Sequence, residues 1–126
     1  MKHFLVLTVL TAFLTSFIAN AGIDEVVAAM KSGNSMMLAK YFDSSVEISM
    51  PDKSNSYSKS QAELVLKDFF SSNPVKSFEI IHKGESAGSQ FCIGTLQTKN
   101  GAFRTTIFMK QKGDMQVLQE LRFEYR

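Results

Sequence analysis

The chain has 126 residues, of which 44% are hydrophobic and 21% charged, and its formal net charge is +2. This length supports a single domain, and no cluster of lysine and arginine marks a surface for nucleic acid or an anionic membrane. The one cysteine, Cys92, cannot form an intramolecular disulfide, so packing alone must hold the domain together.

Residues 1–21 have the pattern of a cleaved secretory signal peptide. Lys2 supplies a positive charge, residues 4–18 carry none, and Ala19-Asn20-Ala21 provides small residues where a signal peptidase requires them. The apolar run is shorter than the about 20 residues of a membrane span, although a retained N-terminal anchor is the alternative. We therefore expect a single mature domain over residues 22–126, periplasmic or extracellular, with a charge near +1 after the loss of Lys2 and no membrane contact.

The first part of this domain predicts two short helices. Apolar residues recur at helical spacing, first at Ile23, Val26, Val27 and Met30, and then at Met37, Leu38, Tyr41 and Phe42. Gly33 ends the first helix, and Asn34 or Ser35 can cap the second. Alternation over residues 46–50 then predicts a strand, which Pro51 ends.

A third, longer helix follows a polar turn or loop over residues 52–56. Ser58 and Gln61 have capping-box spacing, and Asn73-Pro74 ends the helix. The helical stripe consists of Ala62, Val65, Leu66, Phe69 and Phe70. We expect Phe69 to be deeply buried where this stripe meets a sheet.

From residue 75 onward the apolar period changes from 3.6 to 2. Four strands are predicted, over residues 77–83, 90–98, 102–111 and 115–125, and glycine-bearing turns separate them. Asn100-Gly101 between two alternating runs predicts a hairpin with a type I′ turn. Short connections make neighbouring strands antiparallel, so the four strands should form a meander.

Helices followed by a twisted, mostly antiparallel sheet predict an α+β architecture with the helices on one face. Five segments carry a closer resemblance: Lys31-Ser32-Gly33-Asn34, Tyr41-Phe42, Tyr57-Ser58-Lys59, Asp68-Phe69-Phe70 and Leu121-Arg122-Phe123-Glu124. On these, residues 22–126 resemble a family of small exported bacterial domains of unknown function. The family has the nuclear-transport-factor-2-like, or ketosteroid-isomerase-like, cone fold. That resemblance implies three helices under a curved sheet that encloses a conical pocket.

Alternation predicts which strand residues face this pocket. The more apolar set is assigned inward, and its pocket-lining members are Phe78, Ile80, Phe91, Ile93, Phe103, Thr105, Ile107 and Phe123. The opposite set contains Glu79, Arg104 and Glu120, whose charges would be costly inside without partners. A bulge is expected in the last strand between Leu118 and Leu121.

Four residues are candidates for catalysis: Tyr41, Asp43, Tyr57 and His82. The resemblance implies that enzymes of this fold place a carboxylate or histidine base in the cone, with a tyrosine or protonated acid to stabilise an oxyanion. Only His82 shares the parity of the pocket face, and its alternative is a partly solvated place at the end of its strand, near the rim. The other three have ordinary packing or turn roles as alternatives. One histidine and one cysteine in the mature chain, without carboxylates at ligand spacing, predict no metal site, and no cofactor is expected.

The outward set contains apolar residues among its charges, namely Ile81, Cys92, Leu96, Thr106 and Phe108. Such a patch is typical of an interface, and the resembled fold commonly pairs through this face. Ile81, Leu96 and Phe108 are therefore candidates for a homodimer interface. We expect a non-enzymatic exported domain that binds an apolar small molecule or a protein partner through its pocket or sheet face. An isomerase- or dehydratase-like enzyme using the tyrosines, Asp43 or His82 is one alternative, and a structural dimerisation module is another.

Overall fold

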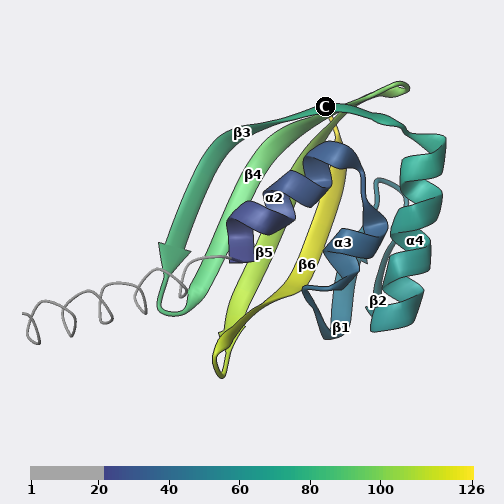
Figure 1. Ribbon diagram of the computed structural model, residues 1–126. Helices are drawn as coiled ribbons and strands as arrows, with labels where there is room; N and C mark the ends of the chain where they lie inside the picture. The colour runs from purple at the N-terminus through teal and green to yellow at the C-terminus, as the bar shows by residue number, and fades with distance from the viewer. Residues whose placement is uncertain (1–21) are drawn as a thin grey trace, which may run out of the picture.

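The computed structural model describes residues 22–126, and the predicted signal peptide lies outside the described residues. The elements follow the α+β order predicted from the sequence (Figure 1). They are α2 (Gly22–Ser32), α3 (Ser35–Ala39), β1 (Phe42–Ser49), β2 (Ser54–Ser58), α4 (Lys59–Ser72), β3 (Val75–Ser86), β4 (Ser89–Thr98), β5 (Gly101–Lys112) and β6 (Met115–Tyr125). Within this range no helix is both long and apolar enough to cross a membrane.

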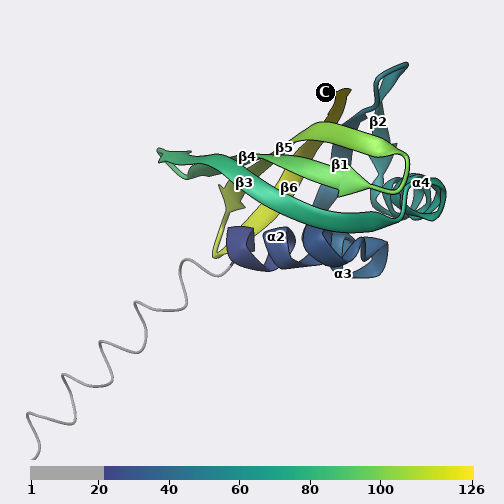
Figure 2. The same ribbon diagram turned by 90° about the horizontal axis from the view of Figure 1, so that it is seen from above.

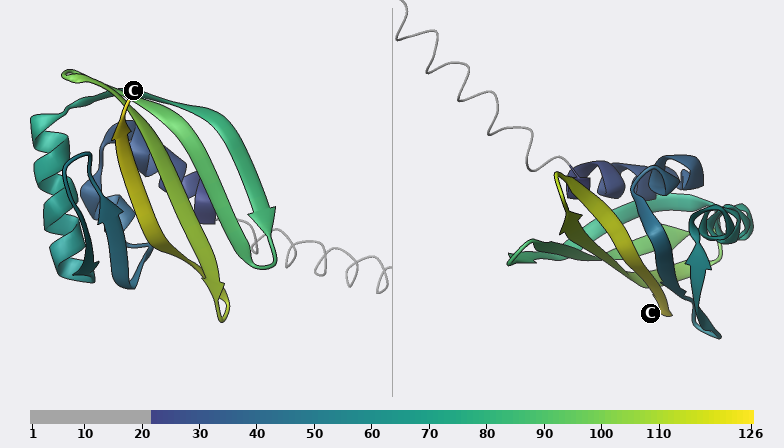
Figure 3. Two further views of the ribbon diagram at one scale, coloured as in Figure 1. Left: turned by 180° about the vertical axis from the view of Figure 1, so that it is seen from behind. Right: turned by 90° about the horizontal axis from the view of Figure 1, so that it is seen from below.

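The six strands form one curved sheet in the order β2-β1-β6-β5-β4-β3. Strands β3 to β6 make the predicted antiparallel meander, and β1 joins β6 in parallel. Helices α2 and α3 cover one face, which we call the inner face, and α4 lies at the β1–β2 end of the sheet (Figure 2). Seen from behind, the outer face carries no helix (Figure 3).

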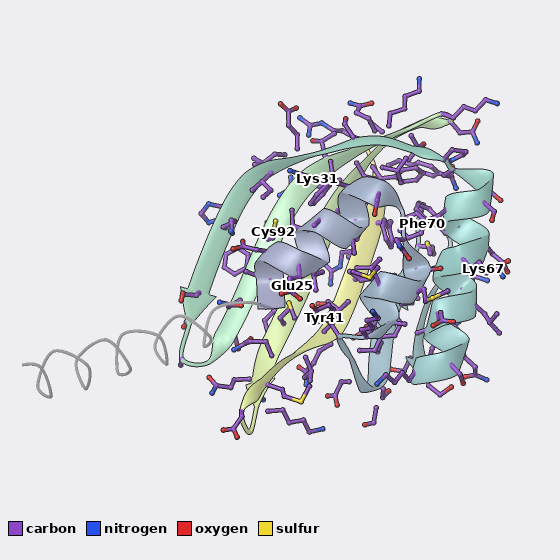
Figure 4. The ribbon with its side chains drawn as sticks, in the orientation of Figure 1. Glu25, Lys31, Tyr41, Lys67, Phe70 and Cys92 are labelled. Atoms are coloured by element: carbon purple, nitrogen blue, oxygen red, sulfur yellow. The ribbon has the colours of Figure 1, made fainter. Side chains whose placement is uncertain are left out.

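The helix ends form as their sequences predict. The Asn34 side chain accepts a hydrogen bond from the Met37 amide at 3.1 Å, which caps α3. Ser58 and Gln61 form the reciprocal capping box of α4. Phe70 lies on the side of α4 that faces the sheet and is buried, whereas Lys67 points away from it (Figure 4).

Two boundaries in the first half differ from the prediction. The second helix ends at Ala39, and Phe42 opens β1 rather than extending the helical stripe. Backbone pairing with β6 replaces the helix at this point, because the Leu118 amide donates to the Tyr41 carbonyl at 2.6 Å and the ladder to β6 begins at Phe42. The polar run expected as a loop contains most of β2, an exposed edge strand whose side chains carry no apolar alternation.

The hairpin between β4 and β5 forms, although its turn is not type I′. Thr98 pairs with Gly101, so the two loop residues are Lys99 and Asn100. Gly101 has a φ of 123°, whereas Asn100 has no positive φ. The glycine therefore serves as the first residue of β5 and not as the second residue of the turn.

Residues of β5 and β6 face the way alternation predicts. Thr105, Ile107, Leu121 and Phe123 are fully buried on the inner face. The predicted bulge in β6 is confirmed, because Phe108 pairs with Glu120 whereas Met109 pairs with Leu118, which leaves Gln119 unpaired.

The predicted facing of β4 is wrong. Cys92 and Leu96 are fully buried on the inner face, so Phe91 and Ile93 lie on the outer face, half-buried. The strand is apolar on both sides, and parity alone could not choose between them. Gly94 explains why β4 takes this orientation, because the Phe78 ring packs over its inner side and a Cβ there would lie 2.6 Å from that ring.

A bulge in β3 changes the facing of His82. Ile80 pairs with Gly94, but the next pair joins His82 to Ile93, so Ile81 is the extra residue. His82 therefore lies on the outer face rather than in the cone, and its ring is 5.4 Å from that of Phe91. Ile80 keeps the predicted inner side but is 39% exposed.

Candidate functional site

Side chains fill most of the cone. Of the predicted pocket-lining residues, Phe78, Thr105, Ile107 and Phe123 are buried core residues with at most 4% exposure. An open cavity of about 480 Å³ remains where α4, the β1–β2 turn and the ends of β5 and β6 meet. We call it the mouth pocket, and it is lined by Met50, Pro51, Asp52, Lys53, Val65, Asp68, Phe69, Ser72, Asn73, Asn100, Phe103 and Tyr125.

A series of aromatic rings forms the floor of the mouth pocket. The Phe69 ring lies 4.5 Å from that of Phe123 in the core and 5.2 Å from that of Phe103. Tyr125 stacks on Phe103 at 5.7 Å and is 78% exposed. Phe69 is only half-buried, so the prediction of deep burial is wrong: the ring bridges the core and the pocket instead of ending inside the core.

Two asparagines on the rim are fixed by the ends of neighbouring elements. The Asn73 amide nitrogen donates to the Phe69 carbonyl at 3.0 Å, and the Asn100 amide nitrogen donates to the Ser72 carbonyl. The Asn100 bond ties the β4–β5 hairpin to the last turn of α4 and satisfies a carbonyl that a helix end leaves free, whereas the Asn73 bond is local to that helix end. Each bond uses the nitrogen of its amide, so the amide oxygen remains available to a ligand.

The rim also carries three charged groups, two carboxylates and one ammonium. Asp52 and Lys53 come from the β1–β2 turn, and Asp68 comes from α4. Within residues 22–126, no ion pair involves any of them. The pocket therefore combines an apolar aromatic floor with a polar rim, which is the usual arrangement of a small-molecule site.

Asp43, a candidate base, is instead tied into the structure. Hydrogen bonds from Lys112, Gln119 and the Ser44 amide lower the pKa of Asp43 to about 2, with the Lys112 bond as the largest cause. A carboxylate with so low a pKa accepts a proton poorly near neutral pH. Its partners join β1 to the β5–β6 hairpin and to the bulge residue of β6, which gives Asp43 a structural role.

The other catalytic candidates are scattered. Tyr41 is half-buried against the core between α3 and β1, the Tyr57 hydroxyl accepts from Asn55 on the edge strand β2, and His82 is exposed on the outer face. None of the four candidates lines the mouth pocket. The fold therefore brings no two of them together at this cavity.

Cys92 is buried, and metal-ligating side chains do not cluster within the described residues. Cys92 lies on β4 beneath α2 (Figure 4), and burial raises the pKa of its thiol. A thiol with a raised pKa is a poor nucleophile. In the part of the chain that the structure describes, no group of three or more histidine, cysteine, aspartate or glutamate residues could hold a metal ion.

The outer face carries an apolar group that differs in part from the predicted one. Phe91 and Phe108 are direct cross-strand neighbours, and Ile93 lies beside them opposite Thr106. Ile81, at the β3 bulge, is 57% exposed, as an interface residue could be. Leu96 is fully buried in the core and cannot serve as an interface residue. Arg104, Glu120 and Arg122 surround the group.

Sequence reasoning missed much of the mouth pocket. Tyr125, Asn73 and Asn100 gave no signal of a binding site, because an end-of-strand tyrosine and two asparagines at turns have ordinary local explanations. The available signal was the pairing of the last aromatic residue of the chain with Phe103, which requires the strand register.

Comparison with protein families finds one match that spans nearly the whole described region. The model of the family described as "Domain of unknown function (DUF4783)" matches residues 23–124. A search of curated proteins finds no match.

Solved structures support both the family and the fold. The chain is 34% identical to a DUF4783 family protein from Bacteroides uniformis, with a TM-score of 0.80, covering 83% of this chain and 97% of that one. It is 36% identical to a DUF4783 family protein from Bacteroides fragilis, with a TM-score of 0.77, covering 81% and 96%. An NTF2-like protein of unknown function from Cytophaga hutchinsonii has a TM-score of 0.61 at 9% identity, covering 82% and 86%, a likeness of fold alone.

Proposed function

This chain belongs to the DUF4783 family and has the nuclear-transport-factor-2-like fold, and on that premise we propose that it is a small binding domain that takes an apolar or aromatic small molecule into the mouth pocket. The observation that carries the proposal is the aromatic floor, where Tyr125 remains 78% exposed while its ring stacks on Phe103. An exposed ring held by a second ring offers a ready surface for an apolar or planar molecule. A cavity of about 480 Å³ suits such a ligand.

Binding rather than catalysis fits the polar groups of this pocket. Its rim supplies amide oxygens and charged groups that can orient a ligand, while the residues expected to act as base or oxyanion donor lie elsewhere. The isomerase or dehydratase alternative needs an acid–base pair within hydrogen-bond reach of one substrate position. Tyr41, Asp43, Tyr57 and His82 supply no such pair at the mouth pocket.

A titration with 2-phenylethanol followed by NMR tests this proposal. This neutral probe has a ring for the floor and a hydroxyl for the rim, and it should shift the amide signals of Phe69, Phe103 and Tyr125. Replacement of Tyr125 by Ala removes a stacking surface and should weaken binding about 2- to 10-fold. Leu64→Ala is the matched control, because Leu64 is an exposed apolar residue of α4 outside the pocket.

Two results would contradict the proposal. One is a probe that shifts no signal around the pocket at any concentration up to its solubility limit. The other is binding that Tyr125→Ala and Leu64→Ala weaken equally, because the probe would then recognise exposed apolar surface in general.

The outer face supports a second binding role, pairing with another copy of the chain. Phe91, Ile93 and Phe108 form an apolar centre on a face without helices, and charges of both signs lie around it. An apolar centre with a charged rim is the usual form of an interface. Arg104 and Arg122 near Glu120 and Glu124 would allow opposite charges to meet across a two-fold axis.

We also propose that the domain acts outside the cytoplasm after cleavage between Ala21 and Gly22. The charge-free run over residues 4–18 and the small residues before Gly22 support this proposal. Intact-mass spectrometry of exported protein should give the mass of residues 22–126. A mass that retains residues 1–21 would indicate a membrane anchor instead.

A further inference from the structure

A second cavity lies at the opposite end of the sheet from the mouth pocket, between the β3–β4 and β5–β6 hairpins. Its volume is about 420 Å³. We call it the acceptor pocket, and it is lined by Glu85, Ser86, Ala87, Gly88, Ser89, Gln90, Gln111, Asp114 and Gln116. Two of these residues are carboxylates and none is lysine or arginine, so the lining favours a cation.

Two residues that line this pocket each carry a buried oxygen with no hydrogen-bond partner within the described residues. These oxygens are the amide Oε1 atoms of Gln90 and of Gln116. Buried acceptors are nearly always paired, so an unpaired couple on one lining requires an explanation. Gln111, on the same lining, differs because its amide nitrogen donates to the Gly113 carbonyl at 3.2 Å and its oxygen is not among the unpaired buried atoms.

The first turn of α2 lies against Gln116 and faces a cavity that Gln90 also lines. Gly22 is buried, and a Cβ added to it would lie 2.7 Å from Cβ of Gln116 and 3.3 Å from Met109. Gln90 shares a further cavity with Ile23 and Asp24. The amides of a first helical turn have no acceptor inside the helix, so the start of α2 brings donors into the neighbourhood of Gln116.

We propose that the acceptor pocket receives the α-ammonium group of Gly22 in the mature protein, with that group donating hydrogen bonds to Oε1 of Gln90 and of Gln116. The inference rests on the proposed cleavage between Ala21 and Gly22. An ammonium group has donors and no acceptor, which matches two unpaired oxygens and the nearby carboxylates of Glu85 and Asp114.

The surrounding charges allow a cation at this position. A positive charge at a helix N-terminus opposes the helix dipole, and the acidic residues Asp24 and Glu25 in the first turn of α2 offset that effect. Lys83 is the cation on the inner face of β3, and it is paired with Asp24 at 3.0 Å. Gly22 is the residue that permits this approach, since any side chain would collide with Gln116.

The pKa of the Gly22 amine tests the proposal directly. The protein is produced with a removable leader, and a site-specific protease leaves Gly22 as the first residue. The rate of acetylation of the α-amine is then followed across pH by mass spectrometry of the N-terminal peptide. We expect a pKa about one unit above the usual range of about 7.7–8.0. A Gln90→Met/Gln116→Met double variant should return it to that range, and Gln111→Met is the matched control that should leave it raised.

Three outcomes overturn the proposal. The first is a Gly22 amine that titrates in its usual range in the wild-type protein. This measurement needs no variant, so it decides the matter even if the double variant fails to fold. A raised pKa that persists in the folded double variant removes the two oxygens as its cause. Exported protein that begins at a residue other than Gly22 contradicts the cleavage itself, a result distinct from failed docking.

Discussion

The two faces of the sheet are built from the same strands and yet have different roles. On the inner face, helices cover a packed set of side chains such as Leu96, Ile107 and Phe123, each with no exposed surface. On the outer face, Phe91, Ile93 and Phe108 are half-buried by their own neighbours, and no helix within residues 22–126 covers them. Apolar residues thus occur on both sides, and the difference lies in what covers them. The covered residues stabilise the fold, whereas the uncovered residues remain available for contact with a partner.

The largest test of this comparison is a truncation on the inner face. Replacement of Phe123 by Ala should lower the free energy of unfolding by about 3–5 kcal/mol, since it removes a fully buried ring that contacts Phe69. Chemical denaturation measures the change. The matched outer-face truncation, Phe108→Ala, should cost less than half as much in the monomer, and equal costs would mean that the two faces do not differ in packing.

A smaller loss is expected from filling the space at Gly94. In Gly94→Ala the new methyl group would lie 2.6 Å from the Phe78 ring and 2.7 Å from the Glu79 carbonyl oxygen, which is backbone and cannot rotate away. Overpacking of this kind costs about 1–3 kcal/mol, measured as a shift of the denaturation midpoint. Gly94 has no positive φ, so the collision and not backbone strain accounts for the expected cost.

Asp43 tests how firmly β1 is joined to the hairpin at the edge of both faces. Its pKa of about 2 in the folded protein lies below the 3.8 of an unperturbed aspartate, so folding favours the ionised form. The stabilisation is therefore present above pH 4 and is lost as the pH falls from about 4 toward 2. Asp43→Asn should cost about 1–2 kcal/mol at pH 7, with the lower figure favoured by screening of exposed Lys112. The difference between wild type and variant should shrink as the pH falls through about 2 and disappear only below it, and a difference constant with pH would contradict the assignment.

The smallest expected effect on stability, with a large one on association, comes from Phe108→Glu. A charge at the centre of the outer apolar group should abolish a dimer while changing the stability of the monomer by less than about 1 kcal/mol. Sedimentation of both proteins at tens of micromolar provides the measurement. Gln97→Glu adds the same charge on the same face away from the group and should leave the dimer intact. A monomeric wild-type protein would remove the outer face as a self-association surface.

The sequence predicted the fold well because its strongest signals are local. The capping box at Ser58, the glycine-bearing turns and the change of period after Pro74 depend on neighbours in the chain, and the structure confirms the elements that they predict. Strand β2 was missed because an edge strand of serines and asparagine has no buried side to reveal it.

The candidate site was harder to predict because it depends on register and bulges. One bulge at Ile81 moves His82 to the opposite face, and a strand that is apolar on both sides hides the true orientation of Phe91. The mouth pocket joins Phe69, Phe103 and Tyr125 from three elements, and their contact becomes visible only when the ladder positions are known. Parity describes one strand at a time, whereas a pocket is a property of several.

The position of β6 has a consequence for the order of events during synthesis. This strand is the last to leave the ribosome, yet it lies between β1 and β5 and makes the sole link within the sheet between the β1–β2 hairpin and the other strands. A nascent chain that has reached only Met115 holds two separate pieces of sheet, and the distant pairing that joins them is slow to form. The complete sheet therefore forms only after translation of Tyr125, so the chain stays incompletely folded for as long as it is being made.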